Sequence, residues 1–251
     1  MNSQQWLSYY QNNRNNRPEP KWNLPSSLDD RTQRFLAHSL SHFQLGETGE
    51  GKFLLAQARA QAPDDVVYHE ALRLFIAEEQ EHVRLLERLV LRFGGKTIQR
   101  HWKHALFRLI RHALGLKFEI QLLVIAELVG TAYYRYRLLQ ARTRDPVLEE
   151  ACALILKDEA QHVDFHADWF GDFQSRLLPL ERAVWSAQVQ VLFGAATQVA
   201  WMDHKAGLAI SGANRREFFD EARHECIRFL QRLERNANQN VCEITPETAR
   251  P

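Results

Sequence analysis

Hydrophobic residues recur every three or four positions along most of the chain, the spacing that places them on one face of a helix. No stretch shows the apolar–polar alternation that predicts a half-buried strand. The pattern predicts one helix from Asp29 or Asp30 to about Ala60 and another from the turn at 62–65 to Gly94–Gly95. Four more are expected at about 115–141, 147–172, 178–210 and 215–235. We therefore predict an all-α fold.

The first four predicted helices form two hairpins joined by a long, basic, amphipathic crossover at about 97–118. Antiparallel pairs linked by one long connection are typical of one class of four-helix bundle. The two ends of the chain are rich in polar residues and lack a sustained period, so we expect flexible segments there. The predicted organisation is a flexible segment at 1–28, a helical domain at 29–236 (bundle at about 30–172, extra helices at about 178–235) and a tail at 237–251.

Composition limits the function without naming it. The chain has 251 residues, 45% of them hydrophobic, which suffices for a sizeable core. A formal net charge of +1 gives no reason to expect nucleic acid or an acidic surface as the main partner. Three widely spaced cysteines, Cys152, Cys226 and Cys242, argue against a disulfide framework or a thiolate metal site. The N-terminus does not resemble a signal peptide and no membrane span is predicted, so we expect a cytoplasmic protein.

Three segments contain an acidic residue followed by Glu-x-x-His. They are Glu78-Glu79-Gln80-Glu81-His82, Asp158-Glu159-Ala160-Gln161-His162 and Asp220-Glu221-Ala222-Arg223-His224. Because so short a motif also arises by chance, the helix face on which it lies is the better test. The Glu and His of the first two motifs fall on the apolar stripes of their helices, whereas His224 falls opposite the stripe of its helix. We expect the first two motifs to be buried and the third to be solvated.

Buried carboxylates and imidazoles persist only when they are paired or bound to a metal. Two-metal sites in helical bundles take Glu-x-x-His from two helices and one Glu from each of the other two. On the helix at 115–141 the candidate is Glu127, whose midpoint with the 159/162 pair falls inside the turn at 142–146. On the first helix Glu47 and Glu50 both face the apolar stripe; the turn near 63–64 favours Glu47, and Glu50 stays an alternative.

In this order on four helices, the candidate residues resemble the ligand set of the ferritin-like carboxylate-bridged di-iron proteins: Glu47, Glu79, His82, Glu127, Glu159 and His162. The segments LGETGEG (45–51), AELVGTAYYR (126–135) and ILKDEAQHVDFH (155–166) are more similar to small bacterial oxygenases and oxidases of this superfamily than to ferritin. The resemblance implies a four-helix bundle that binds two Fe ions, with Mn/Fe as a possibility. It also implies that Asp158 hydrogen-bonds His82 and that Glu78 hydrogen-bonds His162.

The implied activity is O2-dependent hydroxylation or oxidation of a small-molecule substrate, with electrons from an external donor. Thr131, one turn beyond Glu127, is a candidate to line the oxygen side of the site. Tyr134 and His166 are candidates to hydrogen-bond near the site or to relay protons. For each of these three residues, a place in the core is the simpler interpretation.

Other functions stay open at this point. Ferroxidase activity, iron storage and peroxidase activity also occur in ferritin-like proteins, although the two extra helices and polar ends suit a storage shell poorly. A hydroxylase that acts on tRNA is known in the superfamily, and the basic segment 100–112 could contact phosphates. Its interleaved apolar residues more simply pack against the bundle, so nucleic acid is not the expected partner. Without a metal, the chain would be a structural bundle with buried Glu–His links.

The segment 184–210 is apolar around most of its predicted helix. A helix that is apolar on most sides is stable in water only when its apolar surface packs against other parts of the protein or against a partner. We expect it either to cap the substrate pocket or to form the interface of a homodimer.

Overall fold

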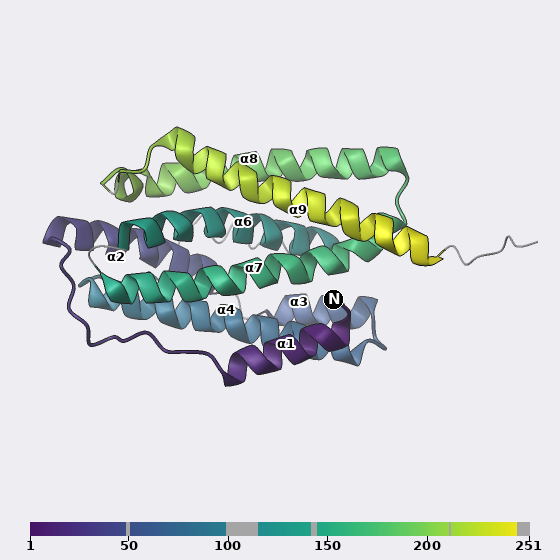
Figure 1. Cartoon of the computed structure of the whole chain (residues 1–251), viewed down its shortest axis with the longest axis horizontal. Helices are drawn as coiled ribbons and strands as arrows, with labels where there is room; N and C mark the ends of the chain where they lie inside the picture. Colours follow the sequence, from purple (N-terminus) through teal and green to yellow (C-terminus); the bar gives the residue numbers. More distant parts are fainter. Residues whose placement is uncertain (49–50, 99–114, 142–144, 211, 245–251) are drawn as a thin grey trace, which may run out of the picture.

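The computed structural model describes residues 1–48, 51–98, 115–141, 145–210 and 212–244. All regular secondary structure in these ranges is helical, which confirms the all-α prediction (Figure 1). The helices are α1 (Ser3–Asn15), α2 (Asp30–Glu47), α3 (Lys52–Gln61), α4 (Val66–Arg92), α6 (Leu116–Ala141), α7 (Pro146–Ser175), α8 (Pro179–Ile210) and α9 (Arg215–Ile244). Within the same ranges, no helix has both the length and the apolar character that a membrane crossing requires.

Caps in the sequence set the ends of the two central helices. The Asp65 side chain accepts a hydrogen bond of 2.9 Å from the backbone N–H of Tyr68 at the start of α4. Asp145 accepts one of 2.8 Å from the backbone N–H of Leu148 at the start of α7. At the end of α4, Gly94 has a φ of +70°, a conformation that glycine adopts without strain. These ends agree with the predicted turns.

The segment predicted as one helix up to about Ala60 is in fact two helices, α2 and α3. Gly51 precedes α3 with a φ of +62°, and a Cβ on it would lie 2.6 Å from side-chain atoms of Ile76. Only glycine therefore fits this close approach to α4. The break makes Glu47 the last residue of α2, and the alternative candidate Glu50 lies outside the described residues.

The prediction of a flexible segment at 1–28 needs correction. Residues 3–15 form α1, which packs along α4 and buries Trp6 and Tyr10. Further along, the Glu19 carboxylate accepts hydrogen bonds of 2.6 and 3.0 Å from the Arg84 guanidinium of α4. Arg88 of α4 lies 4.0 Å from the ring centroid of Trp22. Aromatic burial and charge pairing thus order a segment whose polar composition suggested the opposite.

The C-terminal boundary also differs from the prediction. Helix α9 continues to Ile244, and Ala237, which the prediction placed in the tail, is buried against the rest of the molecule. Residues 245–251 lie outside the described part of the chain.

Two hairpins and an added layer make up the architecture (Figure 1). Helix α2 lies beside α4, and α6 lies beside α7, while contacts between α4 and α7 join the two pairs. Helices α8 and α9 cover α6 and α7 on the side away from α4 (Figure 1). The predicted crossover between α4 and α6 falls largely in residues 99–114, outside the described ranges. The two Glu-x-x-His helices, α4 and α7, therefore meet at the centre of the molecule.

Helix α8 packs against α2, α6 and α9, and the ring of Trp185 near its start lies 5.3 Å from that of Phe170 in α7. Elsewhere on α8, Val184, Val191 and Met202 are each more than half exposed, at 62%, 72% and 58%. Nothing in the structure decides whether this helix caps a substrate pocket or forms a homodimer interface, so both stay predictions.

Candidate metal centre

Four buried side chains from two helices form a group that could hold a metal ion. They are Glu79 and His82 of α4 and Glu159 and His162 of α7, and one ligand atom of each lies within 4.8 Å of the others. His162 Nδ1 is 2.7 Å from Glu79 Oε1, and His82 Nδ1 is 3.6 Å from Glu159 Oε1. The two predicted Glu-x-x-His motifs thus face each other across the α4–α7 contact.

Several polar atoms of this group are buried without a hydrogen-bond partner: Glu79 Oε1, His82 Nδ1, Glu159 Oε2 and His162 Nδ1. The short distances between some of them do not have the geometry of a hydrogen bond. Leaving a buried polar atom unpaired costs about 1–3 kcal/mol, so four at one point require compensation. A cation coordinated by these lone pairs would provide it, which means that the site passes a first test as a metal centre.

Two more carboxylates surround the group. Glu47 comes from the end of α2, and both oxygens of Glu127, from α6, are buried without a hydrogen-bond partner. Burial raises the pKa values of Glu47 and Glu159, and the charges of Glu79 and Glu127 raise them further, so these four carboxylates act on one another. The atoms close enough to share a metal ion come from Glu79, His82, Glu159 and His162, on α4 and α7. A ligand role for Glu47 and Glu127 stays a prediction.

Because several carboxylates are buried close together, the site is stabilised by bound protons or by bound cations. Burial, reinforced by the charge of Glu79, raises the pKa of Glu47 and Glu159 well above the usual value for a glutamate. Burial would also raise the pKa of Glu79, but the contact with His162 outweighs it and holds this pKa at about 2. Burial opposes a charge on His162, yet Glu78 and Glu79 raise its pKa well above the ordinary value. The four carboxylates could carry four negative charges, which two divalent cations would balance.

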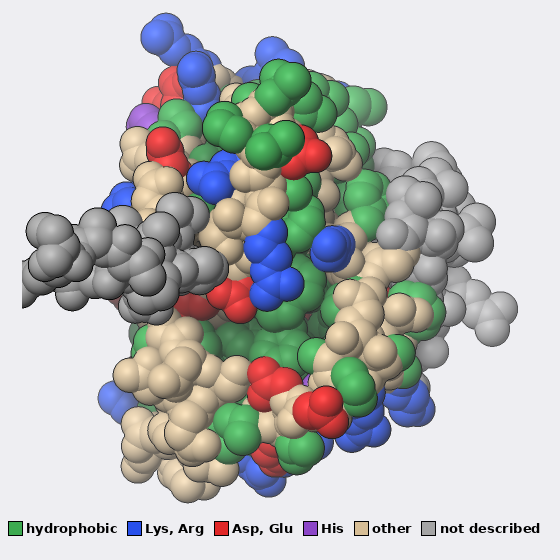
Figure 2. Space-filling model, turned by 90° about the vertical axis from the view of Figure 1, so that its right-hand side faces the viewer, with side chains coloured by type: hydrophobic (Ala, Val, Ile, Leu, Met, Phe, Trp, Pro, Cys, Tyr) green, Lys and Arg blue, Asp and Glu red, His purple; other side chains and the backbone are tan. Residues whose placement is uncertain are grey.

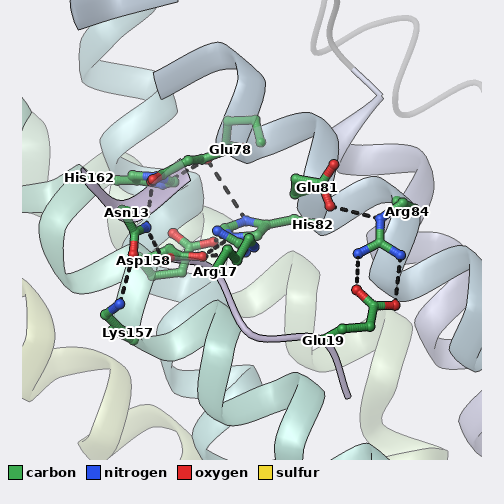
Figure 3. Close-up of polar contacts among 12 residues, drawn as sticks. Asn13, Arg17, Glu19, Glu78, Glu81, His82, Arg84, Lys157, Asp158 and His162 are labelled. Atoms are coloured by element: carbon green, nitrogen blue, oxygen red, sulfur yellow. Dashed lines mark hydrogen bonds and ion pairs between the residues drawn. The ribbon is translucent and has the colours of Figure 1, made fainter. Parts of the chain in front are cut away.

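Two further acidic residues hold the outer edges of the histidine rings. His82 Nε2 donates to Asp158 Oδ2 at 3.2 Å, and His162 Nε2 donates to Glu78 Oε2 at 3.0 Å. Each bond crosses between α4 and α7, so each histidine is oriented by the acid that precedes the Glu-x-x-His of the other helix (Figure 3). Because Nε2 of each ring is hydrogen-bonded to one of these acids, Nδ1 of each ring points toward the Glu–His group. These are the two contacts that the family resemblance led us to expect.

The three residues predicted to act near the site take different positions. Tyr134 donates a long hydrogen bond of 3.5 Å to Glu47 Oε1, and His166 Nε2 lies 3.3 Å from Glu127 Oε1. Both side chains are fully buried and contact candidate ligands. The Thr131 hydroxyl instead donates 2.9 Å to the backbone carbonyl of Glu127 within α6. Because that hydroxyl hydrogen is already bonded, Thr131 is a weaker candidate than the other two.

The third motif is elsewhere. On α9, His224 is exposed and Glu221 forms an ion pair of 2.9 Å with Arg135. His224 is therefore solvated, as its position opposite the apolar stripe predicts, while Glu221 is partly buried beside Arg135.

Sequence reasoning missed the contribution of α1 to the site. Asn13 Nδ2 donates to Glu78 Oε1 at 2.6 Å and to Asp158 Oδ1 at 3.0 Å, and Arg17 pairs with Asp158 at 2.5 Å (Figure 3). A signal was present, because Trp6, Tyr10, Asn13 and Arg17 follow one another at intervals of three or four residues. Asn2 and Gln5 also form a capping box at the start of this helix.

Two cavities are candidates for a substrate. One of about 560 Å³ lies between α6, α7 and α9, and its lining includes Leu128, Thr131 and Leu156. The other, of about 670 Å³, is at the end of the molecule shown in Figure 2, and its lining includes Asp65, Asp168 and Asp172. Trp6 and Phe165 line this second cavity, and the ring of Tyr10 contacts both of them and His162. The first cavity includes a neighbour of Glu127 and is the better candidate for a substrate.

No protein-family model matches this chain, and neither a curated protein nor a solved structure matches it. The buried Glu–His group itself is therefore the feature that points to a function.

Proposed function

We propose that this protein is a ferritin-like di-iron oxidoreductase that activates O2 to hydroxylate or oxidise a small organic substrate. The observation that carries the proposal is the facing pair of buried Glu-x-x-His motifs on α4 and α7, flanked by Glu47 and Glu127. Oxygen-rich donors with two imidazoles and no thiolate suit iron or manganese among the first-row metals. Glu47 of α2 and Glu127 of α6 would add one carboxylate from each of two further helices, as in the ferritin-like arrangement.

Two iron ions bound here would supply the electron transfer to O2 that protein side chains cannot perform. The chain contributes a buried, preorganised site. The carboxylates offset the cation charge, and Asp158 and Glu78 keep Nδ1 of each histidine directed inward. Tyr134 donates to Glu47 and His166 contacts Glu127, so each is placed to hold a proton beside a ligand carboxylate.

A substrate of modest size fits the cavity between α6, α7 and α9, where Leu128 and Leu156 offer an apolar surface. Arg135, Arg228 and Arg232 line its outer part together with Asp164 and Glu225. This combination suits an organic molecule with an apolar body and a polar end. Electrons would come from an external donor.

The first test is metal content. The protein is reconstituted with Fe(II) without oxygen, and Fe and Mn are measured by elemental analysis. We expect about two metal ions per chain, the number that this ligand pattern holds in helical bundles. Admission of O2 should then produce the near-ultraviolet absorption of a ferric pair.

Matched variants locate the metal. Glu79→Ala and Glu159→Ala should lose both the metal and the absorption, whereas Glu221→Ala, the same motif position on α9, should retain both. A well-folded wild-type protein without stoichiometric iron or manganese would contradict the proposal and indicate a structural bundle. Uptake of many irons per chain would favour iron handling, and turnover with H2O2 rather than O2 would favour a peroxidase.

A further inference from the structure

One amide of α1 connects the two carboxylates that orient the histidines. The Asn13 Nδ2 atom donates to Glu78 and to Asp158, and the second oxygen of each carboxylate accepts from His162 or His82 (Figure 3). Asn13, Glu78 and Asp158 are all buried. Bulk water therefore cannot replace this connection.

The orientation of the Asn13 amide is determined by its other neighbour. Lys157 Nζ donates to Asn13 Oδ1 at 2.7 Å. A flipped amide would place its oxygen against two carboxylate oxygens and its NH2 group against an ammonium, which is unfavourable on both sides. Both N–H bonds of Nδ2 therefore point at the two acids.

Few side chains could replace Asn13 here. Aspartate has the same shape but would put a third carboxylate beside the existing two, and leucine has a similar shape without donors. The cations in this network already have other contacts: Arg17 pairs with Asp158, and Lys157 donates to Asn13 itself. The neutral double donor is thus what lets Glu78 and Asp158 approach each other.

We propose that Asn13 is a positioning residue of the metal centre. By holding Glu78 and Asp158 together, it fixes the ring orientation of His82 and His162 and keeps the proton of each ring on Nε2. Nδ1 of each ring is then free to coordinate a metal. Helix α1 is therefore part of the site, and this inference rests on the proposed function.

The test compares metal release from the full-length wild-type protein with release from Asn13→Leu and Asn13→Asp. Asn15→Ala is the matched control, since Asn15 is an exposed asparagine on the same helix. Each protein is loaded with Mn(II), and transfer to an excess of chelator is followed over time. Loss of an outer-shell partner typically costs 10–100-fold in metal affinity, so we expect release to accelerate about tenfold in both Asn13 variants. Release at the wild-type rate from a folded Asn13 variant would overturn the inference.

A second measurement separates this inference from the proposed function. Nitrogen-15 NMR of the metal-free protein reports whether Nε2 of His82 and of His162 carries a hydrogen-bonded proton. We expect this Nε2–H for both rings in the wild type and Asn15→Ala, and its partial loss in the Asn13 variants. If the wild type binds no metal, the proposed function fails, and the Nε2–H signals alone decide: their loss in the Asn13 variants supports the positioning role, and unchanged signals overturn it. If Asn13→Leu does not fold, Asn13→Asp decides.

Discussion

The Glu-x-x-His motifs of α4 and α9 are alike in sequence but differ in environment. On α4, Glu79 and His82 are buried and face the matching pair of α7. On α9, His224 is exposed and Glu221 pairs with an arginine. The same residue types therefore form a candidate metal site only where burial removes water and where no lysine or arginine neutralises the carboxylates first.

The motifs also differ in how their histidine rings are oriented. His82 and His162 each have a carboxylate on the outer ring nitrogen, which leaves the inner nitrogen available. On α9 the acid before the motif, Asp220, is instead within 3.7 Å of Arg216 of the same helix. His224 is exposed, so its ring does not face a carboxylate of a neighbouring helix as His82 and His162 do.

The largest effect should come from removing an inner histidine. His162→Ala should weaken metal binding by more than about 100-fold, because a ligand is worth at least as much as an orienting partner. His224→Ala should bind as the wild type does. Competition with a chromophoric chelator measures both, and an equal loss in the two variants would break the distinction between the motifs.

Metal removal should lower the stability of the wild type. At a free metal concentration 100 times the Kd, binding stabilises the folded state by about 2.7 kcal/mol, which corresponds to roughly 5–11 °C in Tm for a chain of this size. Scanning calorimetry with and without chelator measures the shift. His162→Ala should show little shift and His224→Ala the full one; a wild-type Tm that chelator leaves unchanged contradicts this expectation.

A smaller effect should follow from changing Glu78 or Asp158, the acids that accept hydrogen bonds from the histidine rings. Glu78→Gln and Asp158→Asn each keep the size of the side chain but weaken the hydrogen bond to a histidine, so metal affinity should fall by about 10–100-fold. Asp220→Asn, at the same motif position on α9, should have no effect, since that side chain is 58% exposed. Isothermal titration with Mn(II) distinguishes these outcomes, and wild-type affinity in Asp158→Asn would argue against the outer contacts.

The mildest perturbation is a change of pH, which leaves every side chain in place. The raised pKa values of Glu47 and Glu159 mean that both carry protons at pH values where an ordinary glutamate is ionised. Metal binding must displace these protons, so affinity should weaken as pH falls, by up to about tenfold per pH unit for each proton released. Calorimetry in buffers of different ionisation enthalpy counts the protons. An affinity that does not change between about pH 5 and pH 7 would contradict this assignment.

Helical periodicity was a good guide to most of the chain. The ends predicted for the helices at 115–141 and 178–210 lie within a residue of α6 and α8. Apolar spacing and caps such as Asp145 act locally, so they can be seen without the fold. The break before Gly51 was missed because it depends on Ile76 of another helix.

The sequence by itself determined the helices, the inward face of the motifs on α4 and α7, and the outward face of the motif on α9, since helical spacing alone decides which side chains share a stripe. Only the tertiary structure decided which stripes meet. In the folded chain, Glu79 Oε1 lies 2.7 Å from His162 Nδ1. Helix α1 packs so that Asn13 donates to Glu78 and Asp158. Polar composition could not predict that last contact, because Asn13 is stabilised by carboxylates 65 and 145 positions away along the chain.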